Sequence, residues 1–247
     1  MATQPTKIDA FGFPEGRILA GKYVIEGFLG AGWEGEVYRV NEIRTGISRA
    51  AKVFFPQRNV RDRAFRRYAT KLERLRMCPI VIQYHHSEVF RYRGTPVTSL
   101  ISELVEGELL EDFVKRQRGG RLQPFEALHL IHAIASGMEP IHHLREYHGD
   151  VHDRNVLVKR RGIGFEIKLV DFYHWGRPNR KNIQEDVIQL VRMLYEAVGG
   201  RIRYASQPPT IKDVCCGLRR GLIASKFPTA GHLRSYLESF AWEDDRT

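Results

Sequence analysis

The chain has 247 residues, of which 39 are Lys or Arg and 29 are Asp or Glu, so its formal net charge is +10. Hydrophobic residues make up 43% and charged residues 28%, a balance typical of folded globular proteins and not of disordered ones. No stretch approaches the roughly 20 consecutive apolar residues that cross a membrane. The first residues lack the apolar core of a secretory signal, and three cysteines are too few for a disulfide framework. These features predict a cytoplasmic protein that does not span a membrane.

Short runs of β-branched and aromatic residues dominate residues 23–105, and turn-forming residues separate them. This pattern predicts a mostly antiparallel sheet. Apolar residues at three- and four-residue steps predict one helix inside this region, at Val60–Met77. The predicted strands are Tyr23–Leu29, Glu36–Val40, Ala51–Phe55, Val81–Tyr84 and Val97–Leu104.

Helical patterns dominate the second half of the chain. One predicted helix begins at Pro124 and runs towards Tyr147, with Pro in the first turn, where its missing N–H costs nothing. Asn182 and Glu185 have the spacing of a capping box, which predicts a helix from there through Ala197. The last predicted helix begins at Thr229. It runs through Phe240. A predicted strand hairpin, at residues 156–158 and 165–172, lies between the helix that begins at Pro124 and the one that begins at Asn182.

Together these elements predict an α+β fold with two lobes. A lead-in at residues 1–21 is followed by a β-rich first lobe at 22–105 and a helical second lobe at 106–247. We expect the two lobes to form one domain overall, because each alone carries only part of the motifs described next.

A glycine-rich pattern, G-x-G-x-x-G-x-V, contains Gly30, Gly32 and Gly35 and ends at Val37. In the dinucleotide-binding fingerprint of the same spacing a helix follows, whereas here the residues that follow predict a second strand. Such a hairpin can lay backbone N–H groups over phosphates, because glycine has no Cβ to prevent close approach. Lys52 interrupts the next apolar strand, which is costly unless the ammonium group has an anionic partner. An outward-facing Lys52 on the sheet surface is the alternative.

A second cluster follows the predicted 124–147 helix. His148, Asp150 and Asn155 form an H-x-D-x-x-x-x-N pattern ahead of an apolar strand, and an Asp-Phe pair begins at Asp171 after the predicted hairpin. The four motifs, in this order, resemble the protein-kinase-like superfamily over residues 23–240.

The resemblance implies an ATP- and Mg²⁺-dependent phosphotransferase. Asp150 would orient the attacking hydroxyl and accept its proton, while Asn155 and Asp171 would hold Mg²⁺. Lys52 would neutralise the α- and β-phosphates. The glycines would cover the phosphates, and Asp186 would brace the catalytic loop. Residues implied at the adenine ring are Leu29, Val37, Ala50 and Leu157 on its faces, and the backbone of Glu103 and Val105 at its edge.

Several positions depart from the family pattern. The family pairs its strand lysine with a helix glutamate, for which Glu73 is the candidate. Gly149 stands where an arginine normally binds a phosphate of the activation segment, so the resemblance implies activity without that phosphorylation. Tyr173 replaces the glycine of Asp-Phe-Gly. Asp186 follows Asp171 by only 15 positions, which is short for a protein kinase.

His152 is a further departure, because Ser/Thr protein kinases usually carry lysine two residues after the catalytic Asp. We count His152 among the candidate catalytic residues together with Asp150 and Lys52. The His-Gly-Asp-x-His sequence is similar to that of aminoglycoside and choline-type kinases.

The favoured function is a Ser/Thr protein kinase-like enzyme whose partners are ATP and a protein hydroxyl. A small-molecule hydroxyl acceptor and a nucleotide-binding pseudokinase scaffold are the alternatives. Eight basic residues between Arg58 and Arg76 also raise nucleic acid as a partner, although a solvated helix face is favoured. A zinc site at His129 and His132 is not favoured, because they are three residues apart without the glutamate of a zinc helix. The adjacent Cys215 and Cys216 are interpreted as helix packing rather than a redox site.

Overall fold

The computed structural model describes residues 7–240, which fold into two compact units. Among these residues, the first unit comprises 7–77 and 81–105, and the second comprises 78–80 and 106–240. Strands dominate the first unit and helices the second, which confirms the predicted α+β class and its division into β-rich and helical lobes. No helix in residues 7–240 is long and apolar enough to cross a membrane.

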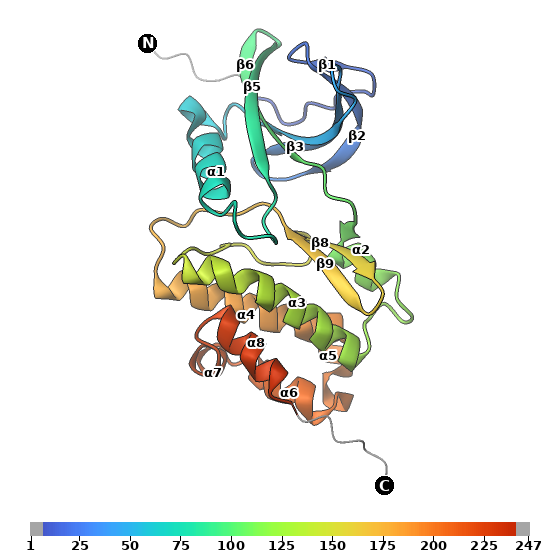
Figure 1. Cartoon of the computed structure of the whole chain (residues 1–247), viewed down its shortest axis with the longest axis vertical. Helices are drawn as coiled ribbons and strands as arrows, with labels where there is room; N and C mark the ends of the chain where they lie inside the picture. Colours follow the sequence, from blue (N-terminus) through green and yellow to red (C-terminus); the bar gives the residue numbers. More distant parts are fainter. Residues whose placement is uncertain (1–6, 241–247) are drawn as a thin grey trace. The chain divides into compact units, whose positions relative to one another are not determined.

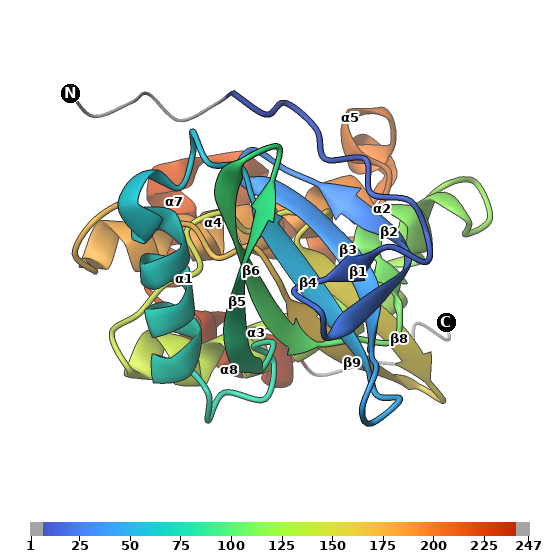
Figure 2. The same ribbon diagram turned by 90° about the horizontal axis from the view of Figure 1, so that it is seen from above.

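The first unit is built on a six-stranded antiparallel sheet with the order β1-β2-β3-β4-β6-β5. Figure 2 shows the twisted sheet with β5 and β6 at one edge and β1 at the other. The strands are β1 (Ile18–Leu19), β2 (Tyr23–Ala31), β3 (Gly35–Glu42), β4 (Ser48–Phe54), β5 (Tyr84–Tyr92) and β6 (Thr95–Glu103).

One face of the sheet carries an aromatic core in which Tyr38, Ala51 and Val53 are fully buried, because residues alternate sides along each strand. Ile8, Phe11 and Phe13 of the lead-in pack into this core. The backbone N–H groups of Phe11 and Gly12 donate to the carboxylate of Glu36, which is 4% exposed, and the Tyr38 hydroxyl also donates to it. Burial, followed by the hydrogen bond to Glu36, raises the pKa of Tyr38. Residues 8–13 are therefore part of the core of this unit.

Helix α1 (Arg63–Arg74) packs against β5 and β6 (Figure 1) and is shorter than the predicted Val60–Met77. A 3-10 turn, η1 (Val60–Asp62), precedes it, with Arg61 and Asp62 in the left-handed region at φ +54° and +58°. These two residues break the helical hydrogen-bond ladder, so the regular helix begins only at Arg63.

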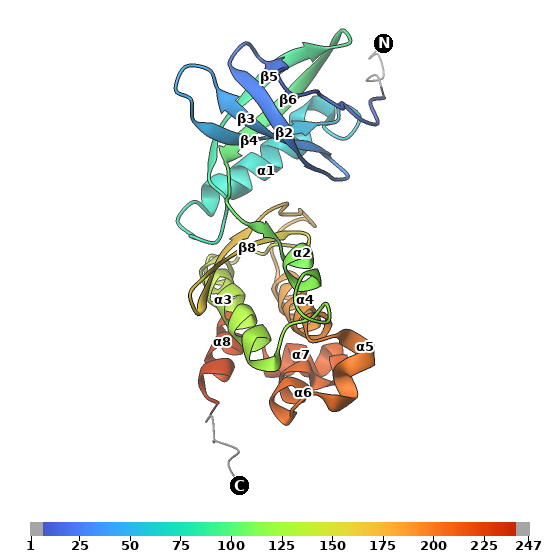
Figure 3. The same ribbon diagram turned by 90° about the vertical axis from the view of Figure 1, so that its right-hand side faces the viewer.

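The second unit combines a small sheet with a bundle of helices. Strand β7 (Glu108–Leu109) pairs with β8 (Val156–Arg161), which pairs with β9 (Gly164–Leu169). Figure 3 shows α3 and α4 under β8, with α8 against α3 and with α6 and α7 below α4. The helices are α2 (Leu110–Lys115), α3 (Pro124–His143), α4 (Arg180–Ala197), α5 (Gly200–Arg203), α6 (Pro209–Cys215), α7 (Arg220–Lys226) and α8 (Ala230–Glu238), with 3-10 turns η2 (Tyr204–Ser206) and η3 (Cys216–Leu218).

Several predicted boundaries were wrong. The strand predicted at Val81–Tyr84 is displaced: β5 begins at Tyr84 and runs to Tyr92. It pairs with the whole length of β6, from Ser102 back to Thr95, so the polar His85-His86 pair lies inside the strand. Helix α4 begins before Asn182, because the Asn179 side chain accepts from the N–H groups of Lys181 and Asn182 and caps the helix there. Helix α3 ends at His143 rather than near Tyr147, and α8 ends at Glu238 rather than Phe240.

Candidate functional site

The glycine-rich loop joins β2 to β3 in the first unit. Its turn closes where the Gly32 N–H donates to the Gly35 carbonyl at 2.9 Å. At Gly35 a Cβ would lie 2.0 Å from the Val53 carbonyl oxygen, so the β3–β4 pairing requires glycine there. A Cβ at Gly30 or Gly32 would meet no atom within 4 Å. The open backbone at these two positions leaves room for a phosphate to approach, so they fit the ATP expectation.

The side chains expected beside adenine share one face of the sheet. Val37 is the register partner of Lys52 across β3 and β4, and Ala50 lies two residues before Lys52 on the same strand face. This is the face opposite the buried aromatic core. Leu29, in the irregular stretch of β2, is 50% exposed. The structure therefore brings Val37, Ala50 and Lys52 together on one accessible face.

The end of β6 is fixed by hydrogen bonds to a neighbouring segment. The Glu103 N–H donates to the Gln83 carbonyl at 3.0 Å, and the Glu103 carboxylate accepts from the Gln83 N–H at 2.9 Å. Val105 is the last residue of the first unit. Leu157 belongs to the second unit, where it pairs with Leu109 and is half-buried.

The catalytic-loop candidates lie together in the second unit. The Asn155 side-chain amide donates to the Asp150 carbonyl at 2.8 Å and to its carboxylate at 3.2 Å. His152 Nε2 lies 3.4 Å from the Asp150 carboxylate. The Arg154 N–H donates to His152 Nδ1 at 3.2 Å, and the Asn155 side-chain amide nitrogen lies 3.0 Å from His152 Nε2. The Asp150 side chain is 53% exposed, so it remains accessible to an acceptor hydroxyl.

Two buried side chains fix this loop. His148 Nδ1 accepts from the Asp150 N–H, and its Nε2 donates to the Val170 carbonyl at 2.9 Å. The Asp186 carboxylate, 1% exposed on α4, accepts from the His148 N–H at 2.6 Å and the Gly149 N–H at 2.9 Å. His142 contributes a third contact to Asp186 at 3.3 Å. The loop that carries Asp150 is therefore bound to both α4 and the segment before Asp171.

Asp171 follows β9 and lies close to the catalytic loop, because the Val170 N–H donates to the Asn155 carbonyl at 3.0 Å. Asp171 adopts φ +56°, a left-handed conformation that Asp tolerates better than most side chains. The Phe172 ring packs on His148 with centroids 4.3 Å apart. The backbone of Asn155 thus lies next to the residue that precedes Asp171, and the side-chain oxygen atoms of Asn155 and Asp171 are the ligand type that Mg²⁺ prefers.

Comparison with known proteins agrees with this arrangement. The family model described as "Protein kinase domain" matches residues 23–194, more than half of the chain. The chain belongs to the protein kinase domain family.

Two bacterial relatives show how far this similarity extends. The chain is 27% identical over 158 residues to the serine/threonine-protein kinase PknA of Corynebacterium glutamicum, covering 63% of this chain and 33% of PknA. It is 28% identical over 160 residues to the serine/threonine-protein kinase PrkC of Bacillus subtilis, covering 64% of this chain and 23% of PrkC. The chain thus spans a third or less of the length of these relatives. The kinase domain of Mycobacterium tuberculosis PknI has the same fold, with a TM-score of 0.67, 21% identity and coverage of 92% of this chain and 98% of that one.

The kinase-domain expectation for Glu73 is wrong. Glu73 is 54% exposed and pairs with Arg76 at 2.9 Å. Lys52 instead pairs with Glu34 of the glycine-rich loop at 3.1 Å, and its ammonium group lies 4.6 Å from the centre of the Tyr68 ring on α1. The carboxylate beside Lys52 therefore comes from the loop and not from α1.

The short segment after Asp171 is fastened to the catalytic loop at Gly149. Trp175 Nε1 donates to the Gly149 carbonyl at 2.7 Å, and the Trp175 N–H donates to the Tyr147 hydroxyl, also at 2.7 Å. Gly149 has φ +90°, and a Cβ there would lie 2.8 Å from the Tyr173 carbonyl oxygen. An arginine at this position has no room, so the segment is held by direct contacts at the place where the family uses a phosphate-binding arginine. Tyr147 and Trp175 lie outside every motif, so no sequence pattern pointed to them.

Substituting Gly149→Ala should lower kcat about 10- to 100-fold, because the new Cβ displaces the backbone next to Asp150. The matched control is Gly162→Ala in the β8–β9 turn, where φ is +58° but no atom lies within 4 Å of the new Cβ. Both variants lose some stability from positive φ, so both Tm and kcat must be measured. Equal loss of kcat in the two variants would contradict the role given to Gly149.

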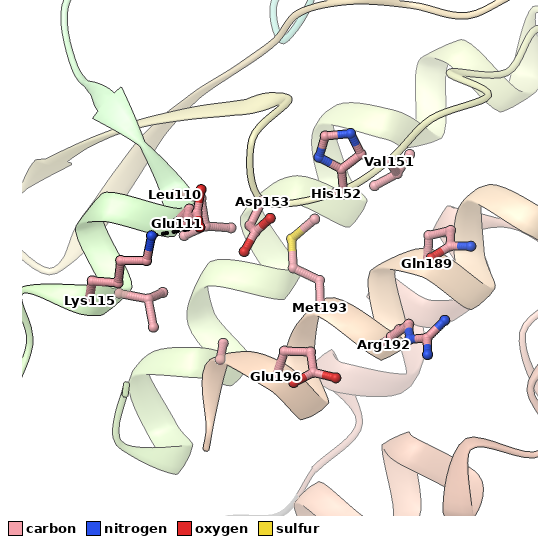
Figure 4. A pocket seen from close by; sticks show the side chains of 12 residues that line it. Leu110, Glu111, Lys115, Val151, His152, Asp153, Gln189, Arg192, Met193 and Glu196 are labelled. Carbon is pink, nitrogen blue, oxygen red and sulfur yellow. Dashed lines mark hydrogen bonds and ion pairs between the residues drawn. The ribbon is translucent and has the colours of Figure 1, made fainter. Parts of the chain in front are cut away.

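A hollow lies beside the catalytic loop within the second unit (Figure 4). Met193 of α4 and Val114 of α2 are among its apolar lining residues. Lys115 is turned towards Glu111 and pairs with it at 2.6 Å (Figure 4). Its other lining residues are Leu110, Val151, His152, Asp153, Gln189, Arg192, Glu196 and Ala197. The lining thus combines apolar surface with charges of both signs.

Three features outside the kinase motifs were also considered as sites: the basic residues from Arg58 to Arg76, the His129–His132 pair and the Cys215–Cys216 pair. Of the eight basic residues from Arg58 to Arg76, Lys71 is buried at 7% and the arginines are exposed, so Lys71 does not belong to a solvated basic face. Within residues 7–240 no group of three His, Cys, Asp or Glu could hold a metal ion, and His132 pairs with Glu238. Burial raises the pKa of the Cys215 thiol to about 12, so it carries little reactive thiolate at neutral pH.

Proposed function

We propose that this kinase domain transfers the γ-phosphoryl group of ATP to a serine or threonine hydroxyl of a protein. The observation that carries the proposal is the cluster of Asp150, Asn155 and Asp171 on one rigid, hydrogen-bonded frame. A pure scaffold has no chemical need for this set of groups. The names of PknA and PrkC support a serine/threonine acceptor.

Each unit contributes different groups in this proposal. In the first unit, the open backbone at Gly30 and Gly32 and the ammonium group of Lys52 bind the phosphates, while Val37 and Ala50 contact adenine. Leu29 and the backbone of Glu103 and Val105 complete the adenine contacts there, and Leu157 adds one from the second unit.

In the second unit, Asp150 orients the acceptor hydroxyl and accepts its proton as the oxygen attacks. His152 faces the Asp150 carboxylate and holds it in place. Asn155 and Asp171 hold Mg²⁺, which neutralises charge on the phosphates when it is bound. The Asn155 amide nitrogen is already used by Asp150, so its oxygen is the atom left to face the ion. The hollow at Met193, with apolar and charged lining, fits side chains of a polypeptide acceptor.

Binding of Mg-ATP should raise the Tm by on the order of 5 °C or more at saturating concentration, since ligand binding to the folded state alone stabilises it. Lys52→Met should lose most of this shift, because the variant lacks the ammonium group that binds the phosphates. Thermal melts with and without Mg²⁺ measure both effects. A wild-type Tm that does not respond to Mg-ATP would contradict nucleotide binding. A shift without turnover would instead support the pseudokinase alternative.

A further inference from the structure

The glycine-rich loop carries an acidic residue at its tip whose side chain turns back onto the sheet. The Glu34 carboxylate accepts from the Lys52 ammonium group at 3.1 Å, and the two side chains are 27% and 11% exposed. The Glu34 carbonyl also accepts from the Phe55 N–H at 2.8 Å, just past the end of β4. Both the backbone and the side chain of Glu34 therefore bind the segment that carries Lys52.

A second contact holds the same loop tip. The Arg58 guanidinium lies 3.2 Å from the centre of the Trp33 ring, within the range of a cation–π interaction. Trp33 is 66% exposed, so this contact lies at the surface, whereas the Glu34 side chain is 27% exposed. The loop tip is thus attached to the β4 segment at Lys52, Phe55 and Arg58.

Helix α1 is not built to supply a carboxylate to Lys52. Its one acidic residue, Glu73, lies on the exposed face with Arg76. The helix residue that faces the ammonium group is Tyr68, and the buried charged residue of the helix, Lys71, is itself a cation. A half-buried lysine is stabilised by a nearby carboxylate that limits its rotamers, and Glu34 lies where it can do this.

We propose that Glu34 is a positioning residue that holds the Lys52 ammonium group for the ATP phosphates, in place of a helix glutamate. This inference rests on the phosphotransfer function proposed above. Its consequence is that closure of the glycine-rich loop and alignment of Lys52 are a single event, which does not depend on movement of α1.

The first test compares the kinetics of three variants. Glu34→Gln should lower kcat about 10- to 100-fold, the effect of losing one charge-assisted hydrogen bond, while changing the KM for ATP by less than about threefold. Glu34→Asp keeps the charge and should recover part of kcat. The control, Glu73→Gln, removes the exposed carboxylate of α1 and should leave both constants unchanged. A Glu34→Gln variant with unchanged kcat, or with tighter ATP binding and faster turnover, would overturn the proposal, the latter because Glu34 would then compete with phosphate.

The second test needs no turnover. Amide hydrogen exchange in peptides covering residues 30–37 should be faster in Glu34→Gln and in Lys52→Met than in the wild type. The double variant should exchange at the same rate as the single variants, because all three lose the same Glu34–Lys52 ion pair. Glu73→Gln should exchange as the wild type does. If Glu34→Gln leaves the exchange rate of the loop unchanged, the inference is wrong even if the enzyme is active. If the exchange is faster but the protein shows no turnover, only the proposed phosphotransfer function is contradicted.

Discussion

Asp150→Asn should lower kcat for phosphoryl transfer by about 10²- to 10⁴-fold, the range expected when a positioned proton acceptor is lost. The Asp150 carboxylate is held by the Asn155 amide and faces His152, so an amide at this position can keep the local hydrogen bonds while it loses the negative charge. The Tm shift with Mg-ATP should persist, because Asp150 does not bind the nucleotide in this account. Steady-state kinetics and thermal melts of the same preparation measure both.

The control for this variant is Asp112→Asn, which neutralises an exposed carboxylate on α2 of the same unit. It should keep wild-type kcat. If Asp150→Asn retains more than about a tenth of the wild-type rate, Asp150 is not the proton acceptor and the roles assigned to the loop fail.

Asp186→Ala should have the largest effect on stability. The carboxylate accepts from two backbone N–H groups and contacts His142; His142 and His148 are buried, and Gly149 is half-buried. Its removal leaves buried donors unpaired, which costs about 3–5 kcal/mol and should lower the Tm by on the order of 10 °C. We expect kcat to fall as well at temperatures where the variant is still folded, because His148 and Gly149 set the backbone position of Asp150.

Glu185→Ala is the matched control, since it removes the neighbouring carboxylate of α4, which pairs with the exposed guanidinium of Arg220. Such a surface pair contributes at most about 1 kcal/mol, so the Tm should fall by only a few degrees. Similar losses in the two variants, measured by thermal melts, would show that the buried hydrogen bonds of Asp186 are not what stabilises the loop.

The ordered motifs of the sequence were sufficient to predict the fold and the location of the catalytic loop. The resemblance to protein kinases is what predicted that Asp150, Asn155 and Asp171 act at one site. It also predicted Val37, Ala50 and Lys52 at the nucleotide; the shared face of Ala50 and Lys52 follows from the two-residue period of a strand, while Val37 joins them through the β3–β4 register.

Contacts between segments that are distant in sequence could not be predicted. The Glu34–Lys52 pair depends on how the loop folds back over β4. The family pattern predicted a helix glutamate instead, but Glu73 lies on the exposed face of α1. Likewise Gly149 was visible as a missing arginine. The reason for it became clear only from Trp175 and Tyr173, which occupy the space where a side chain would lie.

Two further errors concern the start of α4 and the burial of a lysine on α1. The capping residue Asn179 lies just before a run of polar residues that carries no apolar period, so Asn182 had the better local pattern. Lys71 was counted with the exposed arginines because it shares their charge, although it lies on the buried face of α1 with Tyr68 and Leu72. Sequence periodicity identified that face, but it did not indicate that a lysine could lie on it.

The most direct test of the central proposal follows the label from ATP into a protein acceptor. The wild type is incubated with Mg²⁺ and ATP labelled in either the γ- or the α-phosphate, together with a generic protein substrate, and Asp150→Asn serves as the comparison. The account predicts γ-label on serine or threonine hydroxyls, dependent on Mg²⁺ and lost in Asp150→Asn. Transfer of the α-label, or γ-label that persists in Asp150→Asn, would contradict it.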